Sequence, residues 1–444
     1  MFSQPDQSTS APMATVAGSQ CSNSGVPGQN DSPCSCPRRE MPPSTPPILP
    51  CAPIPENVEQ LKQYILKRYA ASSFNCCEHQ PLQLMDDSPP LRLFTDESAK
   101  PIAVHTPSQI PIHWRDQVKA GLDRDEQLQV IEKVPVNEPV EWCSRMVITP
   151  KHDGSPRRVV DFSPLNSHTP RQTHHTQSPW SIVSSIPAGK VKSVVDCWNG
   201  YHSVPIHPAD RKFTTFITPW GRYRYRTSPQ GLLSAGDGYS HRKADIMAGF
   251  TGNQQTCVDD SLVYNDSIEQ NFFDICQFLE IGGRGGCTFN PSKFQFAQQE
   301  VDFLGFRVTH DGIKTNDEFL QNILQFPAPK NITDVRAWQG AINQISFSFA
   351  SAPIMAPFRH LLSAKVPFQW TAELQEAFDA SKQEIIAQCS KGVRSFDPQL
   401  PTALATDWSK LGLGFWLTLL LPPARMLLQW LADSLYGEQI LFIC

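Results

Sequence analysis

Val191-Lys-Ser-Val-Val-Asp196 and Thr256-Cys-Val-Asp-Asp-Ser-Leu-Val-Tyr264 are the two stretches that decide the fold of this 444-residue chain. The first is typical of a buried strand that ends in a carboxylate. The second is typical of two short strands joined through Asp259 and Asp260 in a tight hairpin. A lone Asp-Asp pair is usually a solvated turn, but the apolar residues on both sides place this pair at the rim of a core.

The acidic side chains of these two stretches indicate metal-dependent phosphoryl chemistry. Two carboxylates about 4 Å apart repel each other by about 4 kcal/mol at an effective dielectric constant of about 20. A divalent cation removes this repulsion, and hard oxygen ligands favour Mg²⁺, which shares its coordination with substrate phosphates. Two such ions stabilise both the attacking and the leaving oxygen of an in-line displacement. The acids alone therefore fit a polymerase, a nuclease or another metal-dependent phosphotransferase.

Further motifs surround the two acidic stretches in a recognisable order. Val194-Val-Asp-Cys-Trp-Asn-Gly-Tyr-His-Ser-Val-Pro-Ile206 resembles the first catalytic motif of gypsy-type LTR retrotransposon reverse transcriptases, and Cys257-Val-Asp-Asp260 resembles their aromatic-x-Asp-Asp box. The other matching blocks are Glu141-Trp-Cys-Ser144, Lys151-His-Asp-Gly154, Val160-Asp-Phe162 with Leu165-Asn166, Ser228-Pro-Gln-Gly231, Phe289-Asn-Pro-Ser-Lys293 and Val301-Asp-Phe-Leu-Gly305. A nuclease explains the acids but not these ordered blocks.

The resemblance implies an α+β, right-hand polymerase fold of fingers, palm and thumb, and an RNA-directed DNA polymerase that uses two Mg²⁺ ions, with Mn²⁺ as a substitute. It implies RNA or DNA template-primer and deoxynucleoside triphosphates as partners. Asp196 and Asp259 resemble the metal ligands and Asp260 the supporting carboxylate. Five other residues resemble substrate-binding positions: Lys151 and Arg157 at the triphosphate, Tyr201 at the sugar, Gln230 beside nucleotide and template, and Lys293 after the catalytic hairpin. Because Arg158 adjoins Arg157, either arginine is a candidate for the phosphate contact.

The chain divides into five predicted segments. These are a Pro/Ser-rich disordered N-terminus (1–55), a short helix and linker (56–100), fingers and palm (101–325), thumb or connection helices (326–395) and a truncated RNase H-like α/β start with an unassigned tail (396–444). Ala403 to Gly414 resembles the first strand of an RNase H domain, with Asp407 as its first metal carboxylate. We expect no RNase H activity from this chain, because no further acid lies in a recognisable context.

Three departures from the family pattern favour an alternative function, a decayed and inactive retroelement fragment that only binds nucleic acid. Cys257 replaces the aromatic residue of the box, and the run Ile281-Gly-Gly-Arg-Gly-Gly286 predicts increased backbone freedom. The C-terminal tail fits no part of an RNase H domain. The active enzyme is favoured by five intact residues: Asp196, Asp259, Asp260, Tyr201 and Gln230.

Charge and composition indicate a binding surface, the state of the cysteines and the cellular location of the protein. The net charge is −5, but the segment from Lys151 to Ala244 carries 13 Lys or Arg against 5 Asp or Glu, so it predicts a local phosphate-binding surface. The 13 cysteines lack disulfide-scaffold or zinc spacing and are expected to be free thiols. The apolar stretch Leu411 to Leu421 is too short to span a bilayer. We therefore expect an intracellular protein, cytoplasmic or nuclear, without a membrane role.

Overall fold

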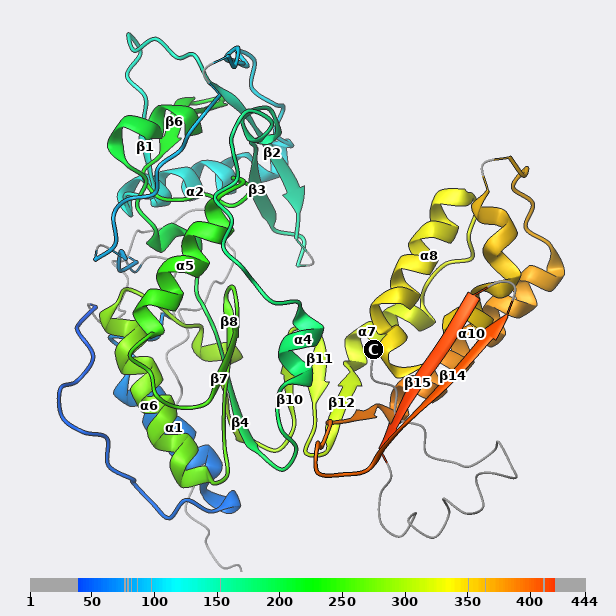
Figure 1. Ribbon diagram of the computed structural model, residues 1–444. Helices are drawn as coiled ribbons and strands as arrows, with labels where there is room; N and C mark the ends of the chain where they lie inside the picture. The colour runs from blue at the N-terminus through cyan, green and yellow to red at the C-terminus, as the bar shows by residue number, and fades with distance from the viewer. Residues whose placement is uncertain are drawn as a thin grey trace, which may run out of the picture.

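The computed structural model describes residues 39–419 except 76, 78, 79, 81, 86, 97, 152, 350, 364, 410 and 411, and it describes only the backbone of residue 352 and of 405–419. Residues 1–38 of the segment predicted to be disordered (1–55) and the predicted tail from residue 420 lie outside these residues. Residues 39–55 are described, and Leu49 and Cys51 pack against the core, so the disorder prediction was wrong for this part. The fold is α+β. Figure 1 shows a fingers region above a palm, with the thumb helices to one side.

The fingers are built on a five-stranded sheet with the order β1-β6-β5-β2-β3. Its strands are β1 (Ile131–Lys133), β2 (Ser144–Pro150), β3 (Pro156–Asp161), β5 (Phe216–Thr218) and β6 (Gly221–Tyr225), and helix α2 (Arg115–Gln127) packs against β1 and β3. The β2–β3 hairpin pairs Arg145 with Asp161 and continues to Pro150 opposite Pro156. This register places Lys151 in the connection at the tip of the fingers.

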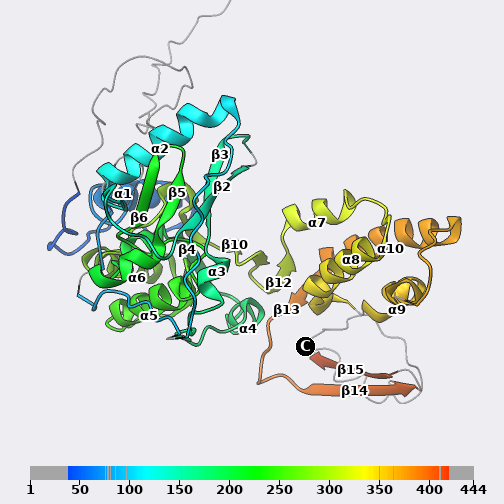
Figure 2. The same ribbon diagram turned by 90° about the horizontal axis from the view of Figure 1, so that it is seen from above.

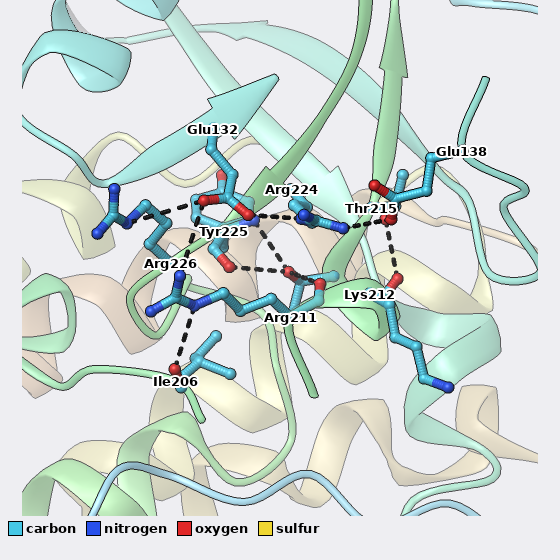
Figure 3. A network of polar contacts seen from close by, with 10 residues as sticks. Glu132, Glu138, Ile206, Arg211, Lys212, Thr215, Arg224, Tyr225 and Arg226 are labelled. Atoms are coloured by element: carbon cyan, nitrogen blue, oxygen red, sulfur yellow. Dashed lines mark hydrogen bonds and ion pairs between the residues drawn. The ribbon is translucent and has the colours of Figure 1, made fainter. Parts of the chain in front are cut away.

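A network of arginines around Glu132 ties β1 to β6 (Figure 3). Glu132 on β1 accepts a hydrogen bond of 2.6 Å from Arg224 on β6 and lies 3.7 Å from Arg211 and 3.9 Å from Arg226. Arg224 also pairs with Glu138 in the following loop. Three cations of the basic segment are therefore committed to an internal network, which reduces the charge that they offer to a nucleic acid.

The palm is a four-stranded sheet with the order β7-β8-β4-β9, formed by β7 (Gln254–Cys257), β8 (Asp260–Asn265), β4 (Val191–Asp196) and β9 (Gln295–Gln298). Strand β4 is central and buried on both faces. Val195 lies in the core that joins palm and fingers, whereas Val194 lies in the core that joins palm and thumb. Successive side chains of a strand point to opposite faces, so burial on both sides explains the continuous apolar run in the sequence.

Helices α1 (Val58–Arg68), α5 (Ala235–Met247) and α6 (Ile268–Arg284) cover the palm sheet. The expected helix from Pro55 is confirmed as a short 3-10 turn followed by α1, with Leu61 and Ile65 fully buried. Residues 69–111 contain no helix or strand among their described positions, yet Met85, Leu91 and Leu93 are buried in the palm core. The segment that composition suggested as a linker is thus packed along the palm.

The glycine run after Ile281 packs closely, which contradicts its predicted freedom. Helix α6 continues through Gly282 and Gly283 to Arg284. A Cβ atom on Gly282 would lie 2.9 Å from the ring of Phe289, and one on Gly283 would lie 2.4 Å from Oγ of Ser73. The sequence prediction was wrong because it considered backbone freedom alone, whereas two of these glycines allow neighbouring segments to approach the helix.

The thumb follows a four-stranded sheet of order β10-β11-β12-β13, with β10 (Val301–Phe303), β11 (Phe306–Val308), β12 (Gly312–Thr315) and β13 (Val393–Arg394). Between β12 and β13 lie α7 (Asp317–Leu324), α8 (Ile332–Ile345), α9 (Ser351–Met355) and α10 (Ala372–Lys391). Trp338 of α8 is fully buried against Phe326 and Phe378, with ring centroids at 5.1 and 4.8 Å. Because β12 and β13 pair with each other, the chain enters and leaves the thumb helices through neighbouring strands.

The last described elements are β14 (Thr402–Ser409) and β15 (Gly412–Leu419), which pair antiparallel over eight residues each. Both views place this hairpin on the thumb side of the molecule (Figures 1 and 2). The predicted strand at Ala403 is confirmed, while β15 was not predicted. Within the residues that the structure describes, no helix is long and apolar enough to span a membrane.

Candidate active site

Three carboxylates meet where strands β4 and β8 lie side by side. Asp196 ends β4 and stands directly opposite Asp260, the first residue of β8. Cys257 pairs with Asp260 across the β7–β8 hairpin, so Val258 and Asp259 form its two-residue turn. The sequence placed the turn at Asp259 and Asp260; this was wrong by one residue, because Asp260 already belongs to the strand.

The turn has an unusual backbone at its first residue. Val258 has φ of 51°, as a primed two-residue turn requires at that position. A β-branched residue at positive φ is strained, typically by about 1–3 kcal/mol. The carbonyl of Asp259 accepts a hydrogen bond of 3.0 Å from the backbone N–H of Cys197, which links the turn to the end of β4. Asp259 is thereby held beside Asp196.

Burial and mutual repulsion make the carboxylates hard to ionise. Burial, followed by the charge of Asp196 and a hydrogen bond to it, raises the pKa of Asp260 to about 6. Burial also raises the pKa of Asp259, against the opposing charge of Lys243. Carboxylates crowded together in this way are stabilised by a cation, and the site is electrostatically suited to one.

The donor set fits a divalent metal. One carboxylate oxygen of Asp259, Oδ1, is buried and has no hydrogen-bond partner in the described structure. Among the residues that the structure describes, no group of three or more His, Cys, Asp or Glu is arranged to hold a metal ion. Mg²⁺ is commonly bound by one or two carboxylates together with water and substrate phosphates. Asp196 and Asp259 are the residues that would hold the ions.

Lys293 and Tyr201 lie near the carboxylates. The ammonium of Lys293 lies 3.0 Å from Oδ2 of Asp196, and its side chain is 62% exposed. Tyr201 lies in a 3-10 turn after β4, half-buried, with its ring edge-on to Tyr239 at 5.6 Å. Burial and the charge of Asp259 raise the pKa of Tyr201.

The two predicted nucleotide contacts from fingers and palm meet each other. Nη2 of Arg157 on β3 donates a hydrogen bond of 2.9 Å to Oε1 of Gln230, and both side chains are exposed. Arg158 instead forms a 2.6 Å ion pair with Asp125 of α2. The two arginines alternate along the strand, so Arg157 is the one available for a phosphate. Lys151 is exposed at the hairpin tip.

Sequence reasoning missed the role of Lys243 on α5. We counted it in the basic segment as a phosphate contact, but it is 1% exposed and donates hydrogen bonds to the carbonyl oxygens of Val258 and Asp259, at 2.8 and 3.1 Å. Lys192 is fully buried and Arg242 nearly so, which also removes them from any phosphate-binding surface. The sequence held one indication that Lys243 faces inward: it lies four residues after Tyr239, and therefore on the same face of one helix.

The predicted RNase H-like acid lies apart from this site in the chain. Asp407 belongs to strand β14 and pairs with Gly414 of β15, and the structure describes only the backbone there. Its metal-binding role stays a prediction.

Comparison with known proteins agrees with the fold. Residues 149–308 match the family model of "Reverse transcriptase (RNA-dependent DNA polymerase)". The Schizosaccharomyces pombe transposon Tf2-3 and Tf2-7 polyproteins are each 24% identical over 277 residues, which cover 62% of this chain and 21% of each polyprotein. The chain thus spans about a fifth of the length of these relatives.

Solved structures share the fold over most of the chain. Foamy viral protease-reverse transcriptase dRH in complex with double-stranded DNA has a TM-score of 0.70 at 18% identity, covering 85% of this chain and 70% of that one. The foamy viral enzyme in complex with an RNA/DNA hybrid has a TM-score of 0.68 at 18% identity, covering 82% and 50%.

The fold is that of a right-hand polymerase, with the acids at the end of the central palm strands. The segment 149–308, which carries Asp196, Asp259 and Asp260, is the part of the chain that is similar to the reverse transcriptase family model. The predicted right-hand fold is confirmed.

Proposed function

We propose that this chain provides the RNA-directed DNA polymerase of a gypsy-type LTR retrotransposon. Its substrates are deoxynucleoside triphosphates and a primer paired with an RNA or DNA template, in an intracellular setting. The observation that carries the proposal is the meeting of Asp196, Asp259 and Asp260 at the end of β4, with a buried oxygen of Asp259 left without a partner. The relatedness to transposon polyproteins supports the retroelement origin.

In the proposed reaction, the 3′ oxygen of the primer forms a bond to the α-phosphorus of the triphosphate, and pyrophosphate leaves. Two Mg²⁺ ions, held by Asp196 and Asp259, would supply positive charge to the attacking and leaving oxygens. Asp260 supports Asp196 from the adjacent strand. Because phosphoryl transfer depends mainly on positioning and charge stabilisation, the other side chains act by placing the substrates.

The substrate-placing residues come from three elements. Arg157 and Gln230 meet where the triphosphate approaches from the fingers. Lys293 supplies a mobile cation beside Asp196 that can shift to a phosphate once the carboxylate binds metal. Tyr201 faces the acidic site from the turn after β4, where an aromatic ring can exclude a ribose 2′-hydroxyl.

Primer extension on an RNA template with Mg²⁺ tests the proposal. The wild-type chain should extend the primer, and Asp259→Asn, which removes one anionic ligand while keeping the side-chain shape, should lower the rate by at least about a thousandfold, or about 4 kcal/mol. Template-primer affinity, measured in parallel by fluorescence anisotropy, should change less than about twofold. Extension by the variant at the wild-type rate would refute the site. Binding without extension by the wild type would instead favour the inactive fragment.

A further inference from the structure

A buried ammonium group lies directly beneath the catalytic hairpin. Lys243 is the ninth residue of α5 and is 1% exposed. Its Nζ donates to both turn carbonyls, those of Val258 at 2.8 Å and of Asp259 at 3.1 Å. The same Asp259 carbonyl accepts the N–H of Cys197, so Lys243 completes a link from α5 through the turn to the end of β4.

Stability alone does not explain a lysine at this position. A buried charge is costly unless it is paired with an opposite charge. In the described structure, Lys243 has no carboxylate oxygen within ion-pair distance; it hydrogen-bonds two neutral carbonyls and the thiol of Cys197, and the ring of Tyr239 lies 5.9 Å away. Its charge acts on the carboxylates of Asp259 and Asp260 only from beyond that distance. A methionine of similar length would fill the space without the cost of desolvation, so the ammonium must provide something that an apolar side chain cannot.

What it provides is restraint of a turn that is strained by itself. Val258 holds φ of 51°, a conformation that a β-branched residue adopts only under constraint. Two charge-assisted hydrogen bonds on consecutive carbonyls fix the two peptide planes on either side of the Asp259 Cα atom. Because the carboxylate of Asp259 projects from the second turn residue, a shift of these planes moves it away from Asp196.

The same helix couples the turn to the sugar side of the site. Tyr239, one turn before Lys243, is fully buried and contacts Tyr201 edge-on at 5.6 Å. A Cβ on Gly200 would lie 2.6 Å from the Tyr239 ring, so the chain leaves β4 in direct contact with α5. Helix α5 therefore contacts both the acidic turn and the segment that carries Tyr201.

We propose that Lys243 is a positioning residue for polymerisation, whose buried ammonium holds the Val258–Asp259 turn in the conformation that places the Asp259 carboxylate opposite Asp196. It contacts no substrate and acts only through the turn. This inference rests on the proposed function, because it assigns the turn to nucleotidyl transfer. The restraint on the turn, however, can be measured without any activity.

The chain offers a matched control in Lys192. This lysine is also fully buried, and it also donates to two backbone carbonyls, those of Lys190 at 2.9 Å and Gln299 at 2.8 Å. It lies on β4, four residues before Asp196, and bonds to the loop after β9 instead of the hairpin. Lys192→Met thus removes an equally buried ammonium without touching the turn.

The test compares Lys243→Met with Lys192→Met by amide hydrogen exchange and by single-turnover primer extension at saturating template-primer. Lys243→Met should lower exchange protection in residues 257–261 and at Cys197 at least tenfold while leaving residues 312–315 unchanged, and should slow extension at least tenfold. Lys192→Met should change hairpin protection and extension less than twofold. If Lys243→Met does not fold, Lys243→Gln, which keeps an NH₂ donor group but is shorter and uncharged, is measured in the same way and should show the same localised loss.

Release of the turn strain gives an independent readout. Glycine adopts positive φ freely, so Val258→Gly in the Lys243→Met background should recover extension at least threefold, relative to the effect of Val258→Gly alone. Hairpin protection within twofold of wild type, protection lost equally across β4, β8 and β12, or no recovery with glycine would each overturn the inference. Absence of extension by the wild type would refute the proposed function, while the exchange data would still decide whether Lys243 holds the turn.

Discussion

Replacement of Asp260 by asparagine should stabilise the metal-free protein at neutral pH. The folded state raises the pKa of this carboxyl from 3.8 to about 6, chiefly through burial and the charge of Asp196. The folded chain therefore binds more protons than the unfolded chain between about pH 4 and pH 6, and stability falls as pH rises through this window. Above about pH 6 the full cost of ionising Asp260 is present.

The size of the effect follows from the shift. At about 1.4 kcal/mol per pKa unit, the shift corresponds to about 3 kcal/mol, and solvent screening of a partly exposed group reduces this to about 1–2 kcal/mol. Asp260→Asn should raise the free energy of unfolding by that amount at pH 8 and by much less at pH 4. Addition of Mg²⁺ should narrow the difference, because the ion binds the folded wild type and stabilises it.

Urea unfolding at pH 4, 6 and 8, with and without Mg²⁺, measures these differences. Asp266→Asn is the control, since this residue follows the other end of β8 and its side chain is 88% exposed in an ion pair with Lys190. It should change the free energy of unfolding by less than about 1 kcal/mol. If Asp260→Asn is no more stable than wild type at pH 8, or if its advantage does not grow from pH 4 to pH 8, the electrostatic account of the carboxylate pair is wrong.

Five further substitutions test the surroundings of the site and the packing of helices α6 and α8. Tyr201→Ala should raise the kcat/KM for ribonucleotides relative to deoxynucleotides, because the ring no longer excludes a 2′-hydroxyl; an unchanged ratio would leave Tyr201 a packing residue. Arg157→Ala should raise the KM for the triphosphate about tenfold, or about 1.4 kcal/mol, whereas Arg158→Ala should lower stability by about 1 kcal/mol and leave the KM unchanged; equal effects on KM would refute the division of roles. Gly283→Ala should destabilise the protein by about 1–3 kcal/mol, because the new Cβ meets Ser73 at 2.4 Å. Gly340→Ala, with open space on an exposed face of α8, should instead stabilise it by about 0.5–1 kcal/mol in the same denaturation assay.

Elements and site residues could be predicted from the sequence where the local pattern of apolar and polar residues directly reflects burial, capping or a strand end. Strand β4 was readable because it is buried on both faces and therefore continuously apolar up to Asp196. Among the helices predicted within residues 326–395, α10 has a clear start in the sequence, because the Thr371 side chain caps the N–H of Leu374. The site acids were readable because they stand at strand ends, where a side chain reaches the edge of a core.

The remaining features depend on contacts between residues that are distant in the sequence. The choice between Arg157 and Arg158 required the positions of Gln230 and Asp125, which are distant in sequence. The packing of Gly283 required Ser73, which no local pattern brings near. Lys243 was counted as a surface charge because lysine is rarely buried, and only the tertiary fold brings its ammonium to the hairpin.

The return of the chain from α10 to β13 has a consequence for the evolution of the thumb. Gly312 and Ile313 of β12 pair with Arg394 and Val393 of β13, so the two ends of the helical block lie on adjacent strands, about 5 Å apart. A segment whose ends are neighbours behaves as an insertion, because its length and internal packing can change without altering the distance that the rest of the chain must span. Helices can accordingly be gained, lost or exchanged between residues 316 and 392 while the register of the palm strands is preserved.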